Sequence, residues 1–222
     1  MSSTTLSQRN SAFATLRRFA RERAAVERCE LCSLELAARH QHLIELANRK
    51  LVCACDACAI LFANAGSGKY KRVPRQSLSL PEFRLSDMQW ENLLIPINMA
   101  FFFHNTQTDK VAAIYPSPAG ATESLLMLEA WEEIVGENPI LKSLESDVEA
   151  LLVKRVSRMG EQGEETCAEY YIVPIDECYK LVGLIRAHWR GLSGGATVWE
   201  EIRQFFADLQ AHSRVIRETS NA

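Results

Sequence analysis

The chain has 222 residues, of which 47% are apolar and 24% charged, and its formal net charge is −3. This is ordinary globular composition, enough for one large domain or for a small module and a medium one. No stretch approaches the roughly 18 consecutive apolar residues of a transmembrane helix, and the start, MSSTTLSQRN, lacks the apolar core of a secretory signal. We therefore expect a cytoplasmic protein, in which clustered cysteines are more typical of metal or redox sites than of disulfides.

The small net charge conceals an asymmetry between two parts of the chain. Residues 1–82 contain 13 Lys and Arg against 7 Asp and Glu, whereas residues 83–222 contain 12 against 21. We expect two units with complementary surfaces, which could guide docking on a partner protein. The basic excess is spread along 1–82 instead of being concentrated on one helix, so nucleic-acid binding is not expected.

Three segments precede the main domain. Residues 1–28 are expected to form an N-terminal arm with a short helix, because apolar residues recur at helical spacing in AFATLRRFARERAAVER. Residues 29–63 are expected to form a cysteine-rich module, in which RKLVCAC favours a strand. The stretch 64–82 is rich in Gly, Ser, Pro and basic residues, which predicts a connector.

An α+β domain is predicted over 83–215. In chain order, its elements are a helix capped by Ser86 and Gln89, strands at 97–104 and 110–116, a helix ended by Gly136 with a short helical start at Pro139, strands at 148–156 and 169–175, and helices at 176–190 and 196–212. The order β-β-α-β-β-α-α, with strands in hairpin pairs and helices grouped, is typical of α+β proteins. The polar stretches PSPAGATES and SRMGEQGEET are expected to be a loop and a hairpin tip.

Five cysteines within thirty residues carry the strongest chemical signal. The pattern is Cys29-x2-Cys32, then Cys53-x-Cys55-x2-Cys58. Two C-x-x-C pairs about 20 residues apart are typical of zinc ribbons and treble clefs. A tight turn lets both sulfurs of a pair face one ion, and two pairs complete a tetrahedral site. We therefore predict a zinc-ribbon or treble-clef-like module in which Cys29, Cys32, Cys55 and Cys58 bind a structural Zn²⁺.

The fifth cysteine and two histidines leave the ligand set open. Cys53 could face the core or replace Cys55 as a ligand. His40 and His42, at the i, i+2 spacing of one strand face, are possible alternative ligands. Iron is the alternative ion, because a rubredoxin-like centre also uses two C-x-x-C pairs and would make the protein an electron carrier. Against iron, neither pair is followed by the glycine usual after its second cysteine.

Two loops ahead of predicted helices, in PSPAG and GLSGG, are possible anion or partner sites. The residues concerned are Ser117, Gly120, Thr122, Ser193, Gly194 and Gly195. Turns and caps account for these residues without a ligand, and neither loop carries a phosphate-loop motif. We find no G-x-S-x-G, H-E-x-x-H or paired-carboxylate pattern, so the sequence contains no catalytic constellation.

The segments CELC, HQHL, CACDACAILF, AFFFH, YPSPAGATES, VPIDECYKLVGLIRAHWRGLSGG and VWEEI together resemble an uncharacterised bacterial family of about this length. The resemblance runs from about residue 16 to 210. Such proteins are similar to those encoded in gene clusters for actinobacterial-type nickel–iron hydrogenases. The resemblance implies an accessory, maturation or electron-handling role, with a hydrogenase subunit or maturation factor as partner, and it implies no catalytic residues.

Overall fold

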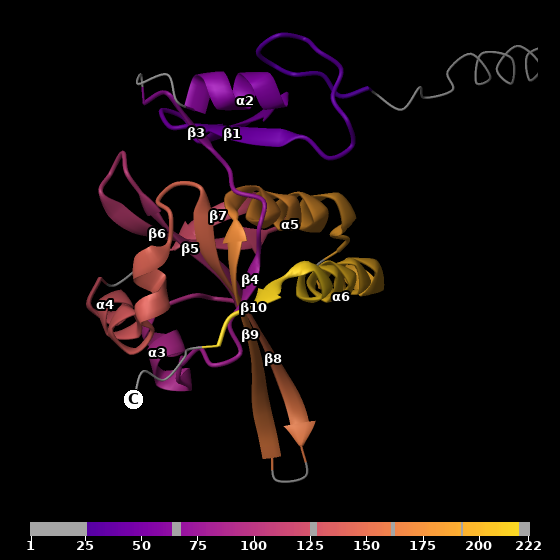
Figure 1. The fold of residues 1–222 in the computed structure, drawn as a ribbon. Coiled ribbons are helices and arrows are strands. Elements are labelled where there is room, and N and C mark those ends of the chain that lie inside the picture. Colours follow the sequence, from indigo (N-terminus) through magenta and orange to yellow (C-terminus); the bar gives the residue numbers. More distant parts are fainter. Residues whose placement is uncertain (1–25, 64–67, 125–127, 161–162, 192, 218–222) are drawn as a thin grey trace, which may run out of the picture.

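The computed structural model describes residues 26–63, 68–124, 128–160, 163–191 and 193–217 (Figure 1). It contains a three-stranded sheet and a seven-stranded sheet with helices, which confirms the mixed α+β class. The helix expected within 12–28 lies outside the described residues, apart from 26–28, which are not helical. In the part of the chain that is described, no helix is both long enough and apolar enough to span a membrane.

The cysteine module is built on the three-stranded sheet, which one helix covers on its outer side (Figure 1). Its elements are the hairpin of β1 (Gln41–Glu45) and β2 (Lys50–Ala54), then α2 (Asp56–Ala63), and β3 (Tyr70–Arg72), which pairs with the other edge of β1. Leu43 and Val52 belong to a small core shared with α2, whereas Ile44 is buried in the core of the larger domain. The sheet therefore lies between α2 and the body of the molecule.

The segment 64–82, expected as a connector, contributes strands to both sheets. Tyr70–Arg72 forms β3 of the small sheet, and Leu78–Ser79 forms β4 beside a long strand of the large sheet. Neither stretch has a run of alternating apolar residues long enough to predict a strand. Their backbone N–H and C=O groups are paired by strands far away in the sequence, which is information that the local sequence does not contain.

The seven-stranded sheet carries the remaining elements. They are β4 (Leu78–Ser79), α3 (Asp87–Asn92), β5 (Met99–Asn105), β6 (Lys110–Ser117), β7 (Gly120–Ser124), α4 (Leu128–Glu137), the 3-10 helix η1 (Pro139–Ser143), β8 (Glu149–Gly160), β9 (Gly163–Pro174), α5 (Ile175–His188), α6 (Gly195–His212) and β10 (Arg214–Val215). The strand order is β10-β4-β9-β8-β5-β6-β7, antiparallel except for the pair of β10 and β4.

Helices cover both faces of this sheet, which explains why its interior strand β5 reads as continuously apolar. Phe101 and Phe103 of β5 belong to the core that α5 and α6 complete. Phe102, between them, points to the opposite core, where its ring stacks on Trp131 of α4 with the centroids 5.1 Å apart. The run AFFF therefore supplies apolar side chains to two layers of helices.

Two further stretches differ from the sequence-based expectations. PSPAGATES does not lead as a loop into a helix: Ser117 and Gly120 pair directly, and Gly120 begins the additional strand β7. The φ of +126° at Gly120 is a left-handed conformation that glycine adopts without strain. The polar linker between the second pair of strands is also mostly strand, because β8 and β9 stay paired from Glu149 to Gly160 and form a ribbon that projects from the body (Figure 1).

Candidate metal centre

Four cysteine sulfurs converge at one end of the module. The Sγ atoms of Cys29, Cys32, Cys55 and Cys58, here called the cysteine tetrad, all lie within 4.8 Å of one another. The Sγ atoms of Cys32 and Cys55 are 3.7 Å apart. Sulfurs bound tetrahedrally to one ion at about 2.3 Å lie about 3.8 Å from each other. The tetrad therefore has the size and donor set of a four-coordinate thiolate metal site.

The first pair of cysteines is held by a tight turn. The Ser33 N–H donates to the Cys29 carbonyl at 2.7 Å, and the Cys29 N–H donates to the Leu34 carbonyl at 2.8 Å. Ser33 has a φ of +64°, in the left-handed region where glycine is usual. The turn thus forms without the glycine that such pairs commonly carry, and the absence of glycine does not prevent the two sulfurs from facing the same point.

The second pair begins a helix instead of a second turn. Cys55 directly precedes α2 and Cys58 lies in its first turn. The Ala59 N–H donates to the Cys55 carbonyl at 2.8 Å, and the Cys58 N–H lies 3.5 Å from the Cys55 Sγ. The positive end of the helix dipole and the Cys58 N–H favour negatively charged sulfur at Cys55.

The pKa values of two thiols in the tetrad are shifted in opposite directions. Burial by itself raises the pKa of the Cys29 thiol, but hydrogen bonds from the backbone N–H groups of Cys55, Leu31 and Cys32 outweigh it and lower the pKa to about 6. Burial and the neighbouring sulfurs raise the pKa of the Cys58 thiol well above its usual value. The polypeptide therefore favours the thiolate of Cys29 and opposes that of Cys58, which the positive charge of a bound ion would stabilise.

The structure places the three possible alternative ligands in a separate group. The ligand atoms of His40, His42 and Cys53 lie within 4.8 Å of one another and are not part of the tetrad. His42 and Cys53 are direct partners in the register of β1 and β2. His42 lies two residues from Ile44 in β1 and so shares its face, toward the body.

The residues singled out in the PSPAG loop make the contacts of a turn. The Ser117 hydroxyl donates to the Gly120 carbonyl at 3.0 Å and lies 3.0 Å from the Thr122 hydroxyl. These bonds hold the β6–β7 turn closed.

The GLSGG loop is likewise accounted for by packing. Gly194 and Gly195 have φ values of +86° and +77° at the start of α6. The Ser193 carbonyl accepts a hydrogen bond from the indole Nε1 of Trp199 at 3.1 Å. The loop therefore sets the entry of α6 and orients a tryptophan.

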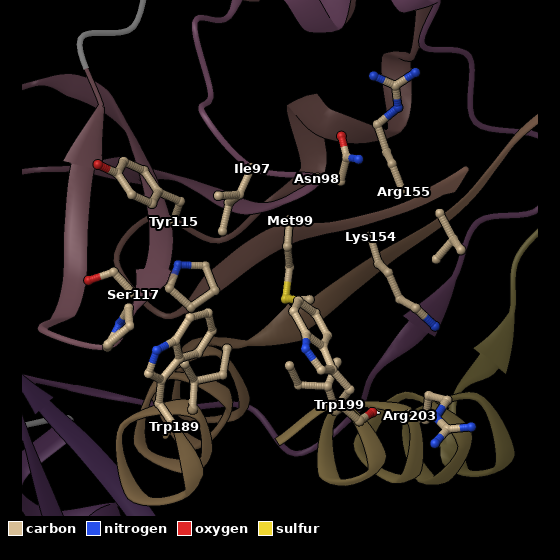
Figure 2. A pocket seen from close by; sticks show the side chains of 15 residues that line it. Ile97, Asn98, Met99, Tyr115, Ser117, Lys154, Arg155, Trp189, Trp199 and Arg203 are labelled. Carbon is tan, nitrogen blue, oxygen red and sulfur yellow. Dashed lines mark hydrogen bonds between the residues drawn. The ribbon is translucent and has the colours of Figure 1, made fainter. Parts of the chain in front are cut away.

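An apolar cavity of about 570 Å³ lies between the sheet and helices α5 and α6 (Figure 2). Its lining includes Ile97, Met99, Ser117, Ile185, Trp189 and Trp199. The two indoles meet edge to face with ring centroids 6.2 Å apart. Among the described residues of GLSGG none lines this cavity, whereas Ser117 of the PSPAG loop does.

Sequence reasoning missed the partners of the two histidines and the cavity. His42 pairs with Asp176, which is 134 positions away, and no local pattern could have joined them. The signal available for the cavity was the pair of tryptophans on either side of GLSGG, since exposed aromatic residues beside a turn often mark a binding surface.

Comparisons with known proteins place the chain in a family. The family described as "Family of unknown function (DUF5947)" matches residues 28–213, a stretch that spans the cysteine tetrad, both histidines and the long strands of the large sheet. No curated protein and no solved structure was found to match the chain. Because the family match covers well over half of the sequence, the chain belongs to the family DUF5947.

Proposed function

We propose that this chain is a cytoplasmic metal-binding accessory protein in which the cysteine tetrad holds a structural Zn²⁺. The observation that carries the proposal is the convergence of the four sulfurs within 4.8 Å. Thiolates select zinc or iron over harder cations such as Mg²⁺ and Ca²⁺. Four protein ligands leave no open position for a substrate, and this is the arrangement of zinc sites that stabilise folds.

The surroundings of the tetrad support a structural role. Cys29, Cys55 and Cys58 are buried in the module's own core, whose other buried side chains are Leu43, Val52, Ala54 and Ala59. A core this small contributes little stability, so a bound ion would supply much of what holds the module together. The order of turn, hairpin and helix, with the second pair at the start of the helix, is treble-clef-like.

A rubredoxin-like iron centre is the second candidate. Cys32 is exposed, which would give an electron donor or acceptor access to one edge of the site. The N–H group that approaches the Cys55 sulfur would also tune a reduction potential. The start of α2 at the second pair favours zinc, because a rubredoxin-like centre places both pairs in turns.

Metal analysis of the protein purified without chelator tests this proposal. We expect a colourless protein, and we expect Cys58→Ser to lose one equivalent of zinc relative to the parent chain. The matched control is Cys167→Ser, which changes an exposed thiol of β9 and should leave the metal content unchanged. A red protein with iron in the tetrad would establish the rubredoxin-like alternative, and identical metal content in Cys58→Ser and the parent would refute a metal in the tetrad.

The partner of this accessory protein is proposed to be a nickel–iron hydrogenase subunit or maturation factor. The proposal rests on the resemblance to proteins encoded beside such hydrogenases and on the apolar cavity, at which Trp199 is 49% exposed. Tryptophans in apolar pockets frequently contribute a large share of protein–protein binding energy.

In co-elution with purified hydrogenase subunits, Trp199→Ala should weaken binding by about 30-fold or more, as expected for a central contact residue. Met88→Ala, at an exposed residue that does not line the cavity, is the control. Absence of co-elution with the parent chain would refute this choice of partner without affecting the zinc proposal.

A further inference from the structure

We propose that His40, His42 and Cys53 form a second metal site, distinct from the cysteine tetrad and with an open coordination position. Their ligand atoms lie within 4.8 Å of one another, and none of the three belongs to the tetrad. Two imidazoles and a thiolate are the donors that a borderline divalent ion such as Zn²⁺ or Co²⁺ prefers. Three protein ligands with one position free characterise zinc sites that bind an exchangeable fourth ligand.

The hydrogen bonds of His40 leave one ring nitrogen available to an ion. The His40 Nδ1 lies 3.0 Å from the Ala37 carbonyl, which can only accept, so Nδ1 carries the proton and Nε2 has a free lone pair. The side chain is only 8% exposed, and Nε2 is buried with no hydrogen-bond partner among the described residues. A buried acceptor without a partner costs free energy, and an ion bound at Nε2 would remove that cost.

The hydrogen bonds of His42 have the same consequence. Its Nδ1 lies 2.6 Å from the Asp176 Oδ2, and a carboxylate accepts, so Nδ1 donates and Nε2 is again the free nitrogen. Metal-binding histidines characteristically donate the other ring N–H to a carboxylate or a backbone carbonyl, which fixes the ring and raises its basicity. One histidine here has a carbonyl partner and the other a carboxylate.

Cys53 reaches the same point from the neighbouring strand. It lies directly opposite His42 in the antiparallel pair, where side chains on one face are about 5 Å apart at Cβ. Its backbone N–H is bound by the Glu30 carboxylate at 3.0 Å, which anchors the strand without using the thiol. Cys53, the fifth cysteine of the module, thus lies beside two histidines that could bind the same ion.

The two histidines face a cleft between the module and the body, which Cys53 does not line. His40 and His42 line a cavity of about 1020 Å³ together with Asp176, Tyr179 and His212 of helices α5 and α6. A water molecule or a small ligand has room to complete the coordination there. The tetrad encloses its ion with four protein ligands, whereas the second site would have three and a position open to solvent. We therefore expect the second ion to bind more weakly and to exchange faster than the first.

Cobalt titration of the full-length protein carrying a single equivalent of Zn²⁺, which the closed tetrad binds first, tests the second site. We expect one additional equivalent of Co²⁺ to bind, with the visible bands of a low-coordinate cobalt ion and a thiolate-to-cobalt charge-transfer band in the near ultraviolet. Cys53→Ser should abolish the charge-transfer band. His42→Ala should weaken binding by at least about 10-fold, and Asp176→Asn, which removes the orienting carboxylate, by about 10- to 100-fold.

Matched control variants decide between the possible outcomes. Cys167→Ser and His104→Gln alter a cysteine and a histidine outside the group and should bind cobalt like the parent chain. Binding that is unchanged in Cys53→Ser and His42→Ala, or no additional equivalent at all, would overturn the proposal. Cobalt bands that disappear in Cys58→Ser but persist in Cys53→Ser would also overturn it, since the ion would then occupy the tetrad. A second site that follows the Cys53 and His42 variants would stand even if the tetrad held no zinc.

Discussion

Gly194 combines a backbone conformation and a close approach that a side chain cannot share. Its φ of +86° lies in the left-handed region, and a Cβ built on it would lie 2.8 Å from the Val198 Cγ1 and 3.1 Å from ring atoms of Trp189. The close contact allows Trp189 to pack over the start of α6 and to line the apolar cavity. One residue therefore positions both a helix and a wall of the cavity.

We predict that Gly194→Ala lowers the free energy of unfolding by at least about 2 kcal/mol, because left-handed strain costs about 1–2 kcal/mol and the clash adds to it. Urea denaturation measures this change. The control is Gly183→Ala in α5, where a Cβ would meet nothing within 4 Å. That substitution should stabilise the protein by up to about 1 kcal/mol, as alanine does in an open helical position. Equal effects of the two substitutions would contradict the packing argument.

At the scale of single elements, local chemistry accounts for some boundaries and distant pairing for others. The capping box predicted at Ser86 is present: the Gln89 N–H donates to the Ser86 hydroxyl at 3.2 Å, and the Ser86 N–H donates to the Gln89 side chain at 2.9 Å. By contrast, β3 and β4 exist because β1 and β9 offer them hydrogen-bonding edges. Helix ends are visible in the sequence because a cap acts over three residues, whereas short strands depend on remote neighbours.

Ser86→Ala should destabilise the protein by about 1 kcal/mol, because it leaves the first N–H groups of α3 without their side-chain acceptor. The midpoint of urea unfolding is the measurement. Ser193→Ala, in an exposed loop position, serves as the control and should change stability by less than about 0.5 kcal/mol. If both variants unfolded at the parent's midpoint, the cap would not contribute to stability.

The whole molecule is joined across the boundary between the cysteine module and the body. Ile44 and Val73 of the module are buried in the core of the body. The Arg49 guanidinium lies 3.4 Å from the buried carboxylate of Asp147 and 3.9 Å from the centroid of the Phe103 ring. Because apolar and charged contacts both cross the boundary, loss of structure in the module should be felt by the large sheet.

Removal of the metal by a strong chelator should therefore lower the melting temperature of the entire chain. Each kcal/mol lost from the free energy of unfolding lowers the melting temperature by about 2–4 °C in a protein of this size. Differential scanning calorimetry, with the zinc released measured in parallel, checks this expectation. Cys58→Ser should show the lowered melting temperature without chelator and respond little when chelator is added. Complete zinc removal with an unchanged melting temperature would show that the ion does not stabilise the fold.

The amino-acid sequence by itself predicted that two pairs of cysteines converge, because C-x-x-C spacing acts through a tight turn and a first helical turn, both formed by neighbouring residues, but it left Cys53 and Cys55 as alternatives. It also determined the α+β class and the capped start of α3. Only the tertiary structure showed that Cys55 and not Cys53 joins the tetrad, because Cys53 pairs with His42 across the hairpin. Tertiary structure likewise brought Asp176 to His42 and shaped both cavities, since these contacts join segments whose separation in the sequence leaves no periodic or local pattern.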